Sequence, residues 1–246
     1  MAGASCPQDV LIAKLETRFP LSESDRDALR GLPCIPRTIP AQSYMLREGT
    51  RPTKCCLLLD GFAFRHKLAA DGGRQIVGLM IPGDFTDLQH LFLREADHNI
   101  QALTRIEVAE FAAEDLRGLA LGRPAVAQAL WIDTLIEASI AREAILNFGR
   151  RNGPMRLAHM LCEFEVRLRQ SGLADAGYDL PMTQEQIGDA TGMTAVHVNR
   201  TLKQLEREGL IVRVKRHLKI ADWVGLQQRA DFNPLYLHLD QARPAD

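Results

Sequence analysis

The chain has 246 residues, 46% of them hydrophobic and 25% charged, with a formal net charge of −1 at pH 7. This length accommodates two domains of ordinary size, and the composition is typical of a globular protein. A net charge close to zero argues against a general affinity for polyanions. The N-terminus has no basic start followed by an apolar run, and no apolar stretch reaches the roughly 20 residues that span a membrane. We therefore expect a cytoplasmic protein without a membrane partner.

The five cysteines give little sign of a disulfide or metal function. Their number is odd, and a chain without an export signal is not expected to rely on disulfides. Cys55 and Cys56 are neighbours in a strand-like run, so at least one of them is expected in the core. No Cys-x-x-Cys pair and no zinc-finger spacing occurs, so we predict no metal site. A redox-sensing thiol stays open, with Cys6 or Cys34 as the more exposed candidates.

The first part of the chain predicts two short helices followed by many short strands. Apolar residues at helical spacing indicate a helix over residues 8–18, and an acidic first turn at Ser22 begins another that reaches about residue 32. From Pro33 onward, glycine or proline interrupts the chain about every 8 to 12 residues, which is typical of an antiparallel barrel or jelly roll. The β-prone runs lie at 56–59, 62–65, 75–81 and 105–111, and Asp71-Gly72-Gly73 is the expected hairpin turn between two of them.

A long helix is predicted over residues 124–148, with Pro124 at a position that proline favours. Its apolar stripe allows two interpretations, because it could pack on the chain's own barrel or pair with the same helix of a second copy. The stripe consists of Ile132, Ile136 and Ile140 one above another, with Leu135, Ile145 and Phe148 beside them. The residues expected to form the dimer contact are Ile132, Leu135, Ile136 and Ile140. A hinge at residues 149–154 leads into a further helix over 154–170.

Residues 183–208 predict two helices joined by a tight turn. Thr183 and Gln186 have the spacing of a capping box at the start of the first helix. Gly192 stands where that helix must stop, a place that favours a residue tolerating positive φ. Thr194 is expected to cap the second helix, which runs to about Glu208. The pattern indicates a helix-turn-helix unit, although an ordinary helical hairpin with a solvated face would share it.

The second of these helices is expected to have one buried side and one polar, partly basic side. Val198, Leu202 and Leu205 repeat at helical spacing and mark the buried stripe. The other side has the size and the side chains to enter a DNA major groove. It is formed largely by Val196, Asn199, Arg200, Lys203 and Arg207.

The segment that follows supports DNA binding. Residues 210–220 alternate apolar and basic side chains, which predicts a β-ribbon wing placed to touch phosphates. Residues 194–220 contain seven Lys or Arg and two Glu, a local net charge of +5 against −6 for the rest of the chain. This concentration indicates a DNA module joined to a part with another role. Because winged helices usually read two-fold sites, we favour a homodimer paired through the long helix.

These features together resemble the bacterial CRP/FNR family of transcription regulators. The resemblance covers about residues 20–223 and rests in the first half on segments within 49–61, 71–74, 81–85 and 107–111. In the second half it rests on 156–158, 182–188 and Val196-His-Val-Asn-Arg-Thr-Leu202. It implies an α+β fold in four parts. These are an N-terminal antiparallel β-roll (jelly-roll, cyclic-nucleotide-binding-like) sensor domain at 20–122, a dimerisation helix at 123–148, a C-terminal winged helix-turn-helix (crp-type) domain at 149–223, and a tail at 224–246.

The family's cyclic-nucleotide chemistry transfers poorly to this chain. Such members place Gly-Glu-Leu after the Pro-Gly-Asp-Phe segment and an Arg-Ser pair about ten residues later. Here the first position reads Thr86-Asp87-Leu88, and the second falls near Ala96-Asp97-His98. An aspartate in place of the phosphate-binding arginine would repel a cyclic nucleotide. Asp87 could still accept a hydroxyl hydrogen bond, so Asp87 and Leu88 are the candidate effector-pocket residues.

Other cofactors of the family also lack a clear match. Cys6 and Cys34 are too few and too far apart to resemble the cysteine run that ligates an iron–sulfur cluster. Haem stays open because His66, His90 and His98 lie in the β-roll, although a lone histidine is usually a surface or packed residue. The effector, and with it any cofactor, is therefore unknown from the sequence.

The resemblance implies which side chains read DNA. Arg200 matches the arginine that pairs with guanine, while Val196 replaces a glutamate that reads cytosine and could instead pack on a thymine methyl. Asn199 could pair with adenine. The half-site is thus expected to keep one G·C pair and otherwise to differ from the best-known ones. The expected backbone contacts come from Thr183, Thr194, His197, Lys203, Lys215 and Arg216.

The resulting expectation is a homodimeric transcription regulator that binds a palindromic promoter operator in double-stranded DNA and acts with RNA polymerase. Whether it activates or represses is left open. An enzyme is not expected, because His66, His90 and His98 lack the His-x-Asp/Glu spacing of metal oxygenases and no phosphate loop occurs. A third interpretation is a ligand-binding module that signals through protein partners instead of DNA.

Overall fold

The computed structural model of the chain describes residues 6–174 and 177–242. These residues form two compact units, which we describe separately. The first contains the described residues up to Arg65, residues 79–138 and those from Asp240 onward; the second contains 66–78 and 139–239. The division falls inside the long helix, so it differs from the functional domains expected from the sequence.

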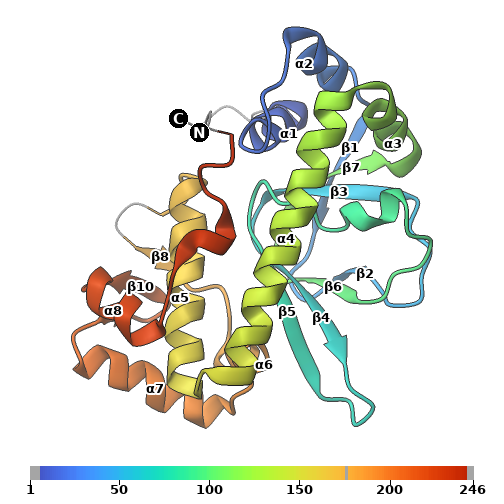
Figure 1. Cartoon of the computed structure of the whole chain (residues 1–246). Helices are drawn as coiled ribbons and strands as arrows, with labels where there is room; N and C mark the ends of the chain where they lie inside the picture. Colours follow the sequence, from blue (N-terminus) through green and yellow to red (C-terminus); the bar gives the residue numbers. More distant parts are fainter. Residues whose placement is uncertain (1–5, 175–176, 243–246) are drawn as a thin grey trace. The chain divides into compact units, whose positions relative to one another are not determined.

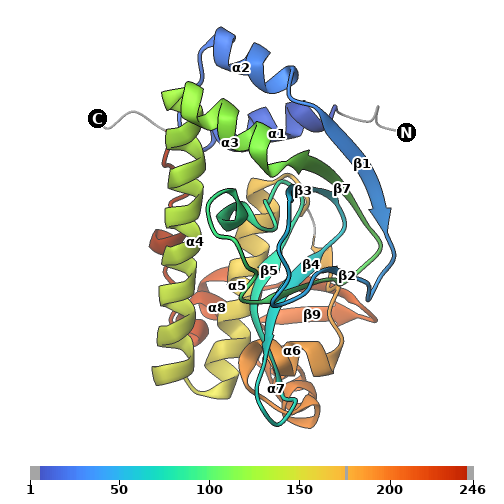
Figure 2. The same cartoon turned by 90° about the vertical axis from the view of Figure 1, so that its right-hand side faces the viewer.

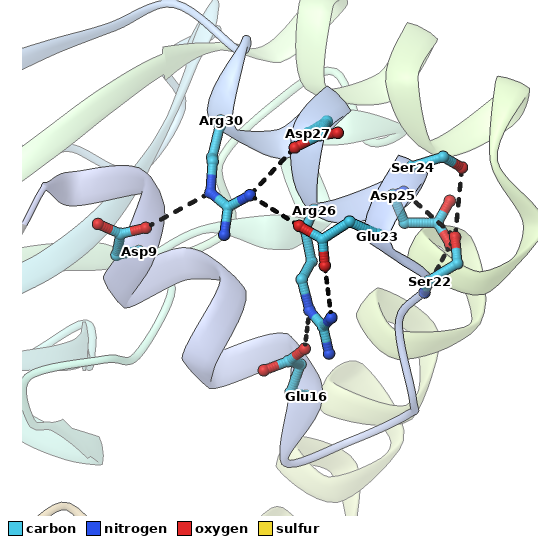
Figure 3. A network of polar contacts seen from close by, with 9 residues as sticks. All are labelled: Asp9, Glu16, Ser22, Glu23, Ser24, Asp25, Arg26, Asp27 and Arg30. Atoms are coloured by element: carbon cyan, nitrogen blue, oxygen red, sulfur yellow. Dashed lines mark hydrogen bonds and ion pairs between the residues drawn. The ribbon is translucent and has the colours of Figure 1, made fainter.

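The first unit begins with two helices, α1 (Pro7–Glu16) and α2 (Glu23–Arg30), close to the predicted ranges. Ser22 caps α2 in a capping box with Asp25. Ion pairs join Arg26 and Arg30 of α2 to Glu16 of α1 and to Glu23 and Asp27 of α2 (Figure 3). Exposed pairs of this kind contribute little stability. The apolar sides of both helices are buried in the first unit, and this burial holds the two helices on the β-domain.

Seven strands form the β-roll, which confirms the predicted antiparallel β-domain. One sheet has the order β1-β7-β3 and the other β2-β6-β4-β5, and β1 lies alongside β7 (Figure 2). Leu58 and Val108 of the first sheet belong to one core cluster with Ala63 and Ile100 of the second. The strands are β1 (Cys34–Ile39), β2 (Tyr44–Leu46), β3 (Lys54–Asp60), β4 (Ala63–Leu68), β5 (Arg74–Met80), β6 (Asn99–Ala102) and β7 (Ile106–Ala112).

Short helices complete this unit. A 3₁₀ helix, η1 (Leu88–Leu91), lies between β5 and β6, and α3 (Ala113–Gly122) follows β7. The long helix α4 (Pro124–Arg150) begins at the predicted proline and is continuous through 27 residues (Figure 1). Gly149, expected in a hinge, therefore lies inside the helix, and only residues 151–152 separate α4 from the next helix. None of the described helices is long and apolar enough to cross a bilayer.

The second unit contains the predicted helix-turn-helix and wing. Its helices are α5 (Gly153–Gln170), α6 (Gln184–Thr191), α7 (Ala195–Arg207) and α8 (Trp223–Ala230), followed by the 3₁₀ helix η2 (Pro234–Leu237). Strands β9 (Ile211–Val214) and β10 (His217–Ile220) make the wing, with β8 (Tyr178–Asp179) on the other side of β10. The stretch expected as a tail therefore contains two helical elements, and α8 packs on α5.

Candidate nucleic-acid interface

The turn between α6 and α7 has the capping geometry that the sequence predicts. Thr183 Oγ1 accepts a hydrogen bond from the Gln186 amide at 3.2 Å, and Gln186 Oε1 accepts one from the Thr183 amide at 2.8 Å. Gly192 ends α6 in the left-handed region with φ 64°. Thr194 Oγ1 then accepts from the His197 amide at 3.2 Å. Both threonines, predicted to contact the DNA backbone, thus have a first role in starting the two helices.

Two glycines allow the turn to close tightly. A Cβ on Gly188 would overlap the carbonyl oxygen of Met193, and a Cβ on Gly153 would come within 2.6 Å of the Met193 sulfur. Neither position has space for a side chain without movement of the turn or of α5. Gly188 and Gly153 therefore fix how closely α6 and α5 approach the turn that precedes α7.

We expect Gly188→Ala to lower the free energy of unfolding by about 1–3 kcal/mol, because the added methyl group meets a backbone atom that cannot swing away. Thermal or urea unfolding would measure the loss. Gly118→Ala is the matched control, since Gly118 lies within α3 and a Cβ added there would have no atom within 4 Å, so the variant should gain about 0.5–1 kcal/mol. Equal stability of the two variants would contradict the close approach.

Arg156 of α5 forms hydrogen bonds to the end of α6. Its Nε donates to the carbonyl oxygen of Thr191 at 2.6 Å, and its Nη2 donates to that of Gly192 at 3.3 Å. Nη1 donates to the carbonyl oxygen of Arg151 at 2.8 Å. A guanidinium satisfies carbonyls that a helix end leaves without partners, and its charge suits the negative end of the helix dipole. Arg156 thereby orients the turn from which α7 starts.

The outer side of α7 presents the predicted base-reading residues together. Val198, Leu202 and Leu205 are buried as expected, and Thr201 is buried with them. Val196 is 81% exposed, and Arg200 and Lys203 are exposed as well. Val196, Asn199, Arg200, Lys203 and Arg207 share the lining of one open hollow with Gln184, Ala195 and Glu206.

The charges in this hollow are mostly free to meet a ligand. Glu206, its acidic member, is engaged by Arg213 of β9 at 3.1 and 3.0 Å. Within the described residues, no ion pair engages Arg200 or Lys203. The pairing of Glu206 leaves a face with a net positive potential, and it also ties the wing to α7. His197, a predicted backbone contact, is only partly exposed, and its ring lies beside Gly153 of α5.

The wing offers one lysine and one partly engaged arginine. Lys215 is exposed at the tip between β9 and β10, in the left-handed region with φ 58°. Arg216 is also exposed, but its Nη2 donates to the carbonyl oxygen of Pro181 at 2.6 Å and its Nε to that of Leu180 at 3.3 Å. Arg216 thus anchors the wing to the segment before α6. Of the two phosphate contacts predicted in the wing, Lys215 is the one whose side chain is not hydrogen-bonded to carbonyl oxygens of the described residues, as that of Arg216 is.

The two candidate effector-pocket residues are core residues. Asp87 Oδ1 accepts hydrogen bonds from the Cys56 amide at 2.9 Å and from Thr86 Oγ1 at 3.1 Å. Burial raises the pKa of Asp87 above its ordinary value, and these hydrogen bonds oppose the shift. Leu88 belongs to the core cluster of the first unit. Asp87 thus joins β3 to the loop before η1, and its contact with an effector stays a prediction.

The β-roll histidines are also packed inside. His66, His90 and His98 are all buried, and the rings of His90 and His98 stack with centroids 6.3 Å apart. Burial lowers the pKa of His98, against the opposing effect of Asp97 at 2.7 Å from its Nδ1. Across residues 6–174 and 177–242, no group of three His, Cys, Asp or Glu side chains is placed to hold a metal ion.

The cysteines differ in exposure much as expected. Cys55 and Cys162 are buried, Cys34 and Cys56 are partly buried, and Cys6 is exposed. Burial raises the pKa of Cys162 to about 12 and also raises that of Cys34. A raised pKa disfavours the reactive thiolate at these two positions.

The exposed face of α4 differs from the predicted dimer stripe. Ile136 is only 5% exposed and packs within its own chain, and Ile132 and Ile140 are partly buried. Leu135, Ile145 and Phe148 of the predicted stripe are exposed. The first two belong to a row that recurs at steps of four and three residues, the repeat of a coiled-coil seam. This row, called here the exposed seam, is Trp131, Leu135, Ala138, Arg142 and Ile145.

Comparisons with known proteins agree with both halves of the fold. Residues 36–122 match the model of the cyclic nucleotide-binding domain, and residues 155–229 match that of the Crp-like helix-turn-helix domain. The nitrogen fixation regulation protein FixK of Bradyrhizobium diazoefficiens is 30% identical over 67% of this chain and 69% of its own. The transcriptional activator protein FnrL of Cereibacter sphaeroides is 28% identical over 79% of each chain. The solved structure of FixK2 from Bradyrhizobium japonicum, 27% identical, covers 80% of this chain and 97% of that one with a TM-score of 0.75.

Proposed function

The chain belongs to the CRP/FNR family of transcription regulators, and from this membership we propose that it binds a palindromic operator as a homodimer through α7. As a DNA-binding transcription regulator it is a non-enzyme. Because its target is chromosomal DNA, it would work in the cytoplasm. Two relatives, FnrL of Cereibacter sphaeroides and AadR of Rhodopseudomonas palustris, have activation in their names, which favours an activator that works with RNA polymerase.

The observation that carries this proposal is the exposed side of α7. A B-DNA major groove is about 12 Å wide and admits one α-helix. Arg200 would donate two hydrogen bonds to guanine O6 and N7, and Asn199 would bond adenine N6 and N7. Val196, whose side chain is almost fully exposed, would be buried against a thymine methyl. Exposure of a β-branched apolar side chain at the start of α7 is explained by such a contact.

The exposed seam of α4 supports the homodimer. Trp131, Leu135 and Ile145 are large apolar side chains left in solvent along one line of a 27-residue helix. Pairing with the same line of a second copy would remove them from water, and Arg142 within the seam would set its register, as polar residues do in coiled coils. A pair of helices related by a two-fold axis would present two α7 helices to the two halves of a palindrome.

A contact inside the second unit would carry a signal from the sensor strands to α6. Arg74, in the hairpin of β4 and β5, donates from Nε to Asp189 Oδ2 of α6 at 2.7 Å. Gln75 Nε2 donates to the Asp189 carbonyl oxygen at 2.6 Å. Displacement of this hairpin would therefore act directly on the first helix of the helix-turn-helix.

Removal of the wing charge should weaken the dependence of DNA affinity on salt. For Lys215→Ala we expect the slope of log K against log[salt] to fall by about 1 per subunit, because one phosphate contact and its released counterion are lost. Fluorescence anisotropy of labelled operator DNA at several salt concentrations measures the slope. Arg105→Ala, which removes an exposed charge from the β-roll, should leave the slope unchanged. An unchanged slope for Lys215→Ala would remove the wing from the interface.

Recovery of the DNA bound to the protein in cells tests the proposed function as a whole. We expect the recovered fragments to share an inverted repeat that lies upstream of genes. Recovery of no common sequence, together with co-purification of a protein partner, would instead support a module that signals without DNA.

A further inference from the structure

The two-residue break between α4 and α5 contains a buried arginine. Arg151 is only 7% exposed. Its Nη1 donates to Glu143 Oε1 at 2.6 Å and to Asn147 Oδ1 at 2.7 Å, both on α4. Its Nη2 donates to the Asp231 carbonyl oxygen at 2.8 Å and to Asp231 Oδ2 at 3.1 Å, and Nε also donates to Oδ2 at 3.2 Å. One guanidinium thus joins the end of α4 to the residue that follows α8.

The same C-terminal segment packs on α5. The rings of Phe232 and His159 form a T-shaped contact with centroids 5.1 Å apart, and Tyr236 stacks on His159 at 5.8 Å. The Tyr236 hydroxyl donates to Glu163 Oε2 at 2.7 Å. His159 in turn lies 3.2 Å from Glu143 of α4 through its Nε2. Residues 231–237 therefore contact α5 directly and α4 through Arg151.

The charges of this cluster favour one fixed arrangement. Burial lowers the pKa of His159, so its ring is largely neutral at neutral pH and Arg151 is the cation that balances Glu143. A buried guanidinium is stable only while its partners stay in place, because loss of one side leaves a desolvated charge. Asp231 supplies one whole side of this coordination and takes the left-handed conformation, with φ 50°, that ends α8. The hydrogen-bonded arrangement around Arg151 is therefore expected to form or to break as a unit.

We propose that residues 231–237 form a C-terminal clamp that fixes the angle between α4 and α5 through Arg151. Only residues 151–152 connect the two helices, so their backbone would otherwise act as a swivel. Arg156 of α5 holds the turn before α7, and the clamp therefore sets the direction in which α7 is presented. Arg151 is a positioning residue in this scheme and touches no DNA. The match to the Crp-like helix-turn-helix domain ends at residue 229, so residues 231–237 lie outside the matched range.

Two truncations of the full chain test the clamp. A chain that stops after Ala230 lacks it, whereas a chain that stops after Leu239 keeps it. We expect the shorter chain to show at least tenfold faster hydrogen exchange at the backbone amides of residues 151–153, 155 and 156. We also expect about tenfold weaker binding to its recovered DNA sequence. The longer chain should match the wild type in both measurements. The proposal is wrong if the shorter chain exchanges and binds like the wild type.

If truncation impairs folding, point variants test the clamp in the full chain. Asp231→Ala removes the two hydrogen bonds from Arg151 to Asp231 Oδ2 and leaves only the one to the backbone carbonyl oxygen. Arg151→Lys keeps the charge but cannot reach both sides. Both should speed exchange at the same backbone amides while the melting of the β-roll is unchanged. The affinity arm rests on the proposed function, whereas the exchange arm does not. A wild-type protein that fails to bind DNA would therefore overturn the proposed function, while unchanged exchange in both variants would overturn the clamp alone.

Discussion

Glutamate at both Leu135 and Ile145 should convert the protein into a folded monomer whose affinity for its operator is at least 100-fold lower. The two side chains are 54% and 72% exposed, so their replacement disturbs no core of the single chain. In a two-fold pair of α4 helices, however, the change buries four carboxylates where apolar contact existed, which the dimer cannot tolerate. A monomer binds one half-site only. In the dimer, binding of the first α7 holds the second α7 close to its half-site, and loss of this effect lowers the affinity by a factor of about 10²–10⁴.

Light scattering of the purified variant gives its mass, and anisotropy with labelled operator gives its affinity. Leu121→Glu is the matched control, because it places the same charge on an exposed leucine of α3 outside the exposed seam and should stay dimeric. Ile136→Glu separates the two candidate stripes, since Ile136 is a core residue and the variant should unfold instead of dissociating. A double variant at 135 and 145 that remains dimeric would show that the exposed seam is not the interface.

Arg200→Ala is expected to weaken operator binding by about 1–3 kcal/mol, or roughly 5- to 150-fold, and to leave binding to random DNA nearly unchanged. The guanidinium is exposed on α7 and within the described chain forms no ion pair, so its loss costs the free protein little. Its energy would come from two hydrogen bonds to one guanine, and those exist only on the correct sequence. Anisotropy titrations on operator and random duplexes at one salt concentration measure both affinities.

The control for this variant is Arg105→Ala, which deletes an exposed arginine of the β-roll and should change neither affinity. An equal loss on both duplexes for Arg200→Ala would mean that Arg200 binds phosphate. The role of base reader would then pass to Asn199 or Val196, its neighbours on the same side of α7.

The helix-turn-helix could be predicted almost completely from the sequence because its signals are local. The side chains of Thr183 and Gln186 each accept a hydrogen bond from the other's backbone amide, within four residues. The left-handed turn at Gly192 needs only a glycine. Thr194 and the buried repeat of α7 likewise depend on neighbours in the same helix. Features that a segment determines by itself can be recognised without knowledge of the rest of the chain.

Elements that depend on distant partners could not be predicted in this way. β1 contains Pro36 and exposed residues, and it exists because Cys34 to Ile39 pair with β7 more than 60 residues away. β2 and β8 are only three and two residues long and offer no periodicity to detect. The clamp at 231–237 is held by contacts to Arg151 and α5, and short aromatic segments of this kind carry no signal of their partner.

The packing of two predicted site residues, Ile136 and Asp87, could not be read from the sequence for the same reason. α4 has apolar residues on two sides, and periodicity alone does not tell which side packs against the helix's own chain. It therefore places Ile136 in the dimer stripe, although this residue is buried within the single chain. Asp87 occupies the place of a ligand-binding carboxylate in the family pattern. Its bonds to Cys56 and Thr86 come from the pairing of a loop with β3, which no motif reveals.

The most direct test of a dimeric DNA reader is selection of bound sequences from a random DNA pool, performed in parallel with the wild type and with Arg200→Ala. The wild type should enrich an inverted repeat whose half-sites each keep one G·C pair, and the variant should enrich the same repeat with that position relaxed. An enriched sequence without two-fold symmetry would contradict the dimeric reader. An identical sequence from both proteins would contradict the role of Arg200 and with it the placement of α7 in the groove.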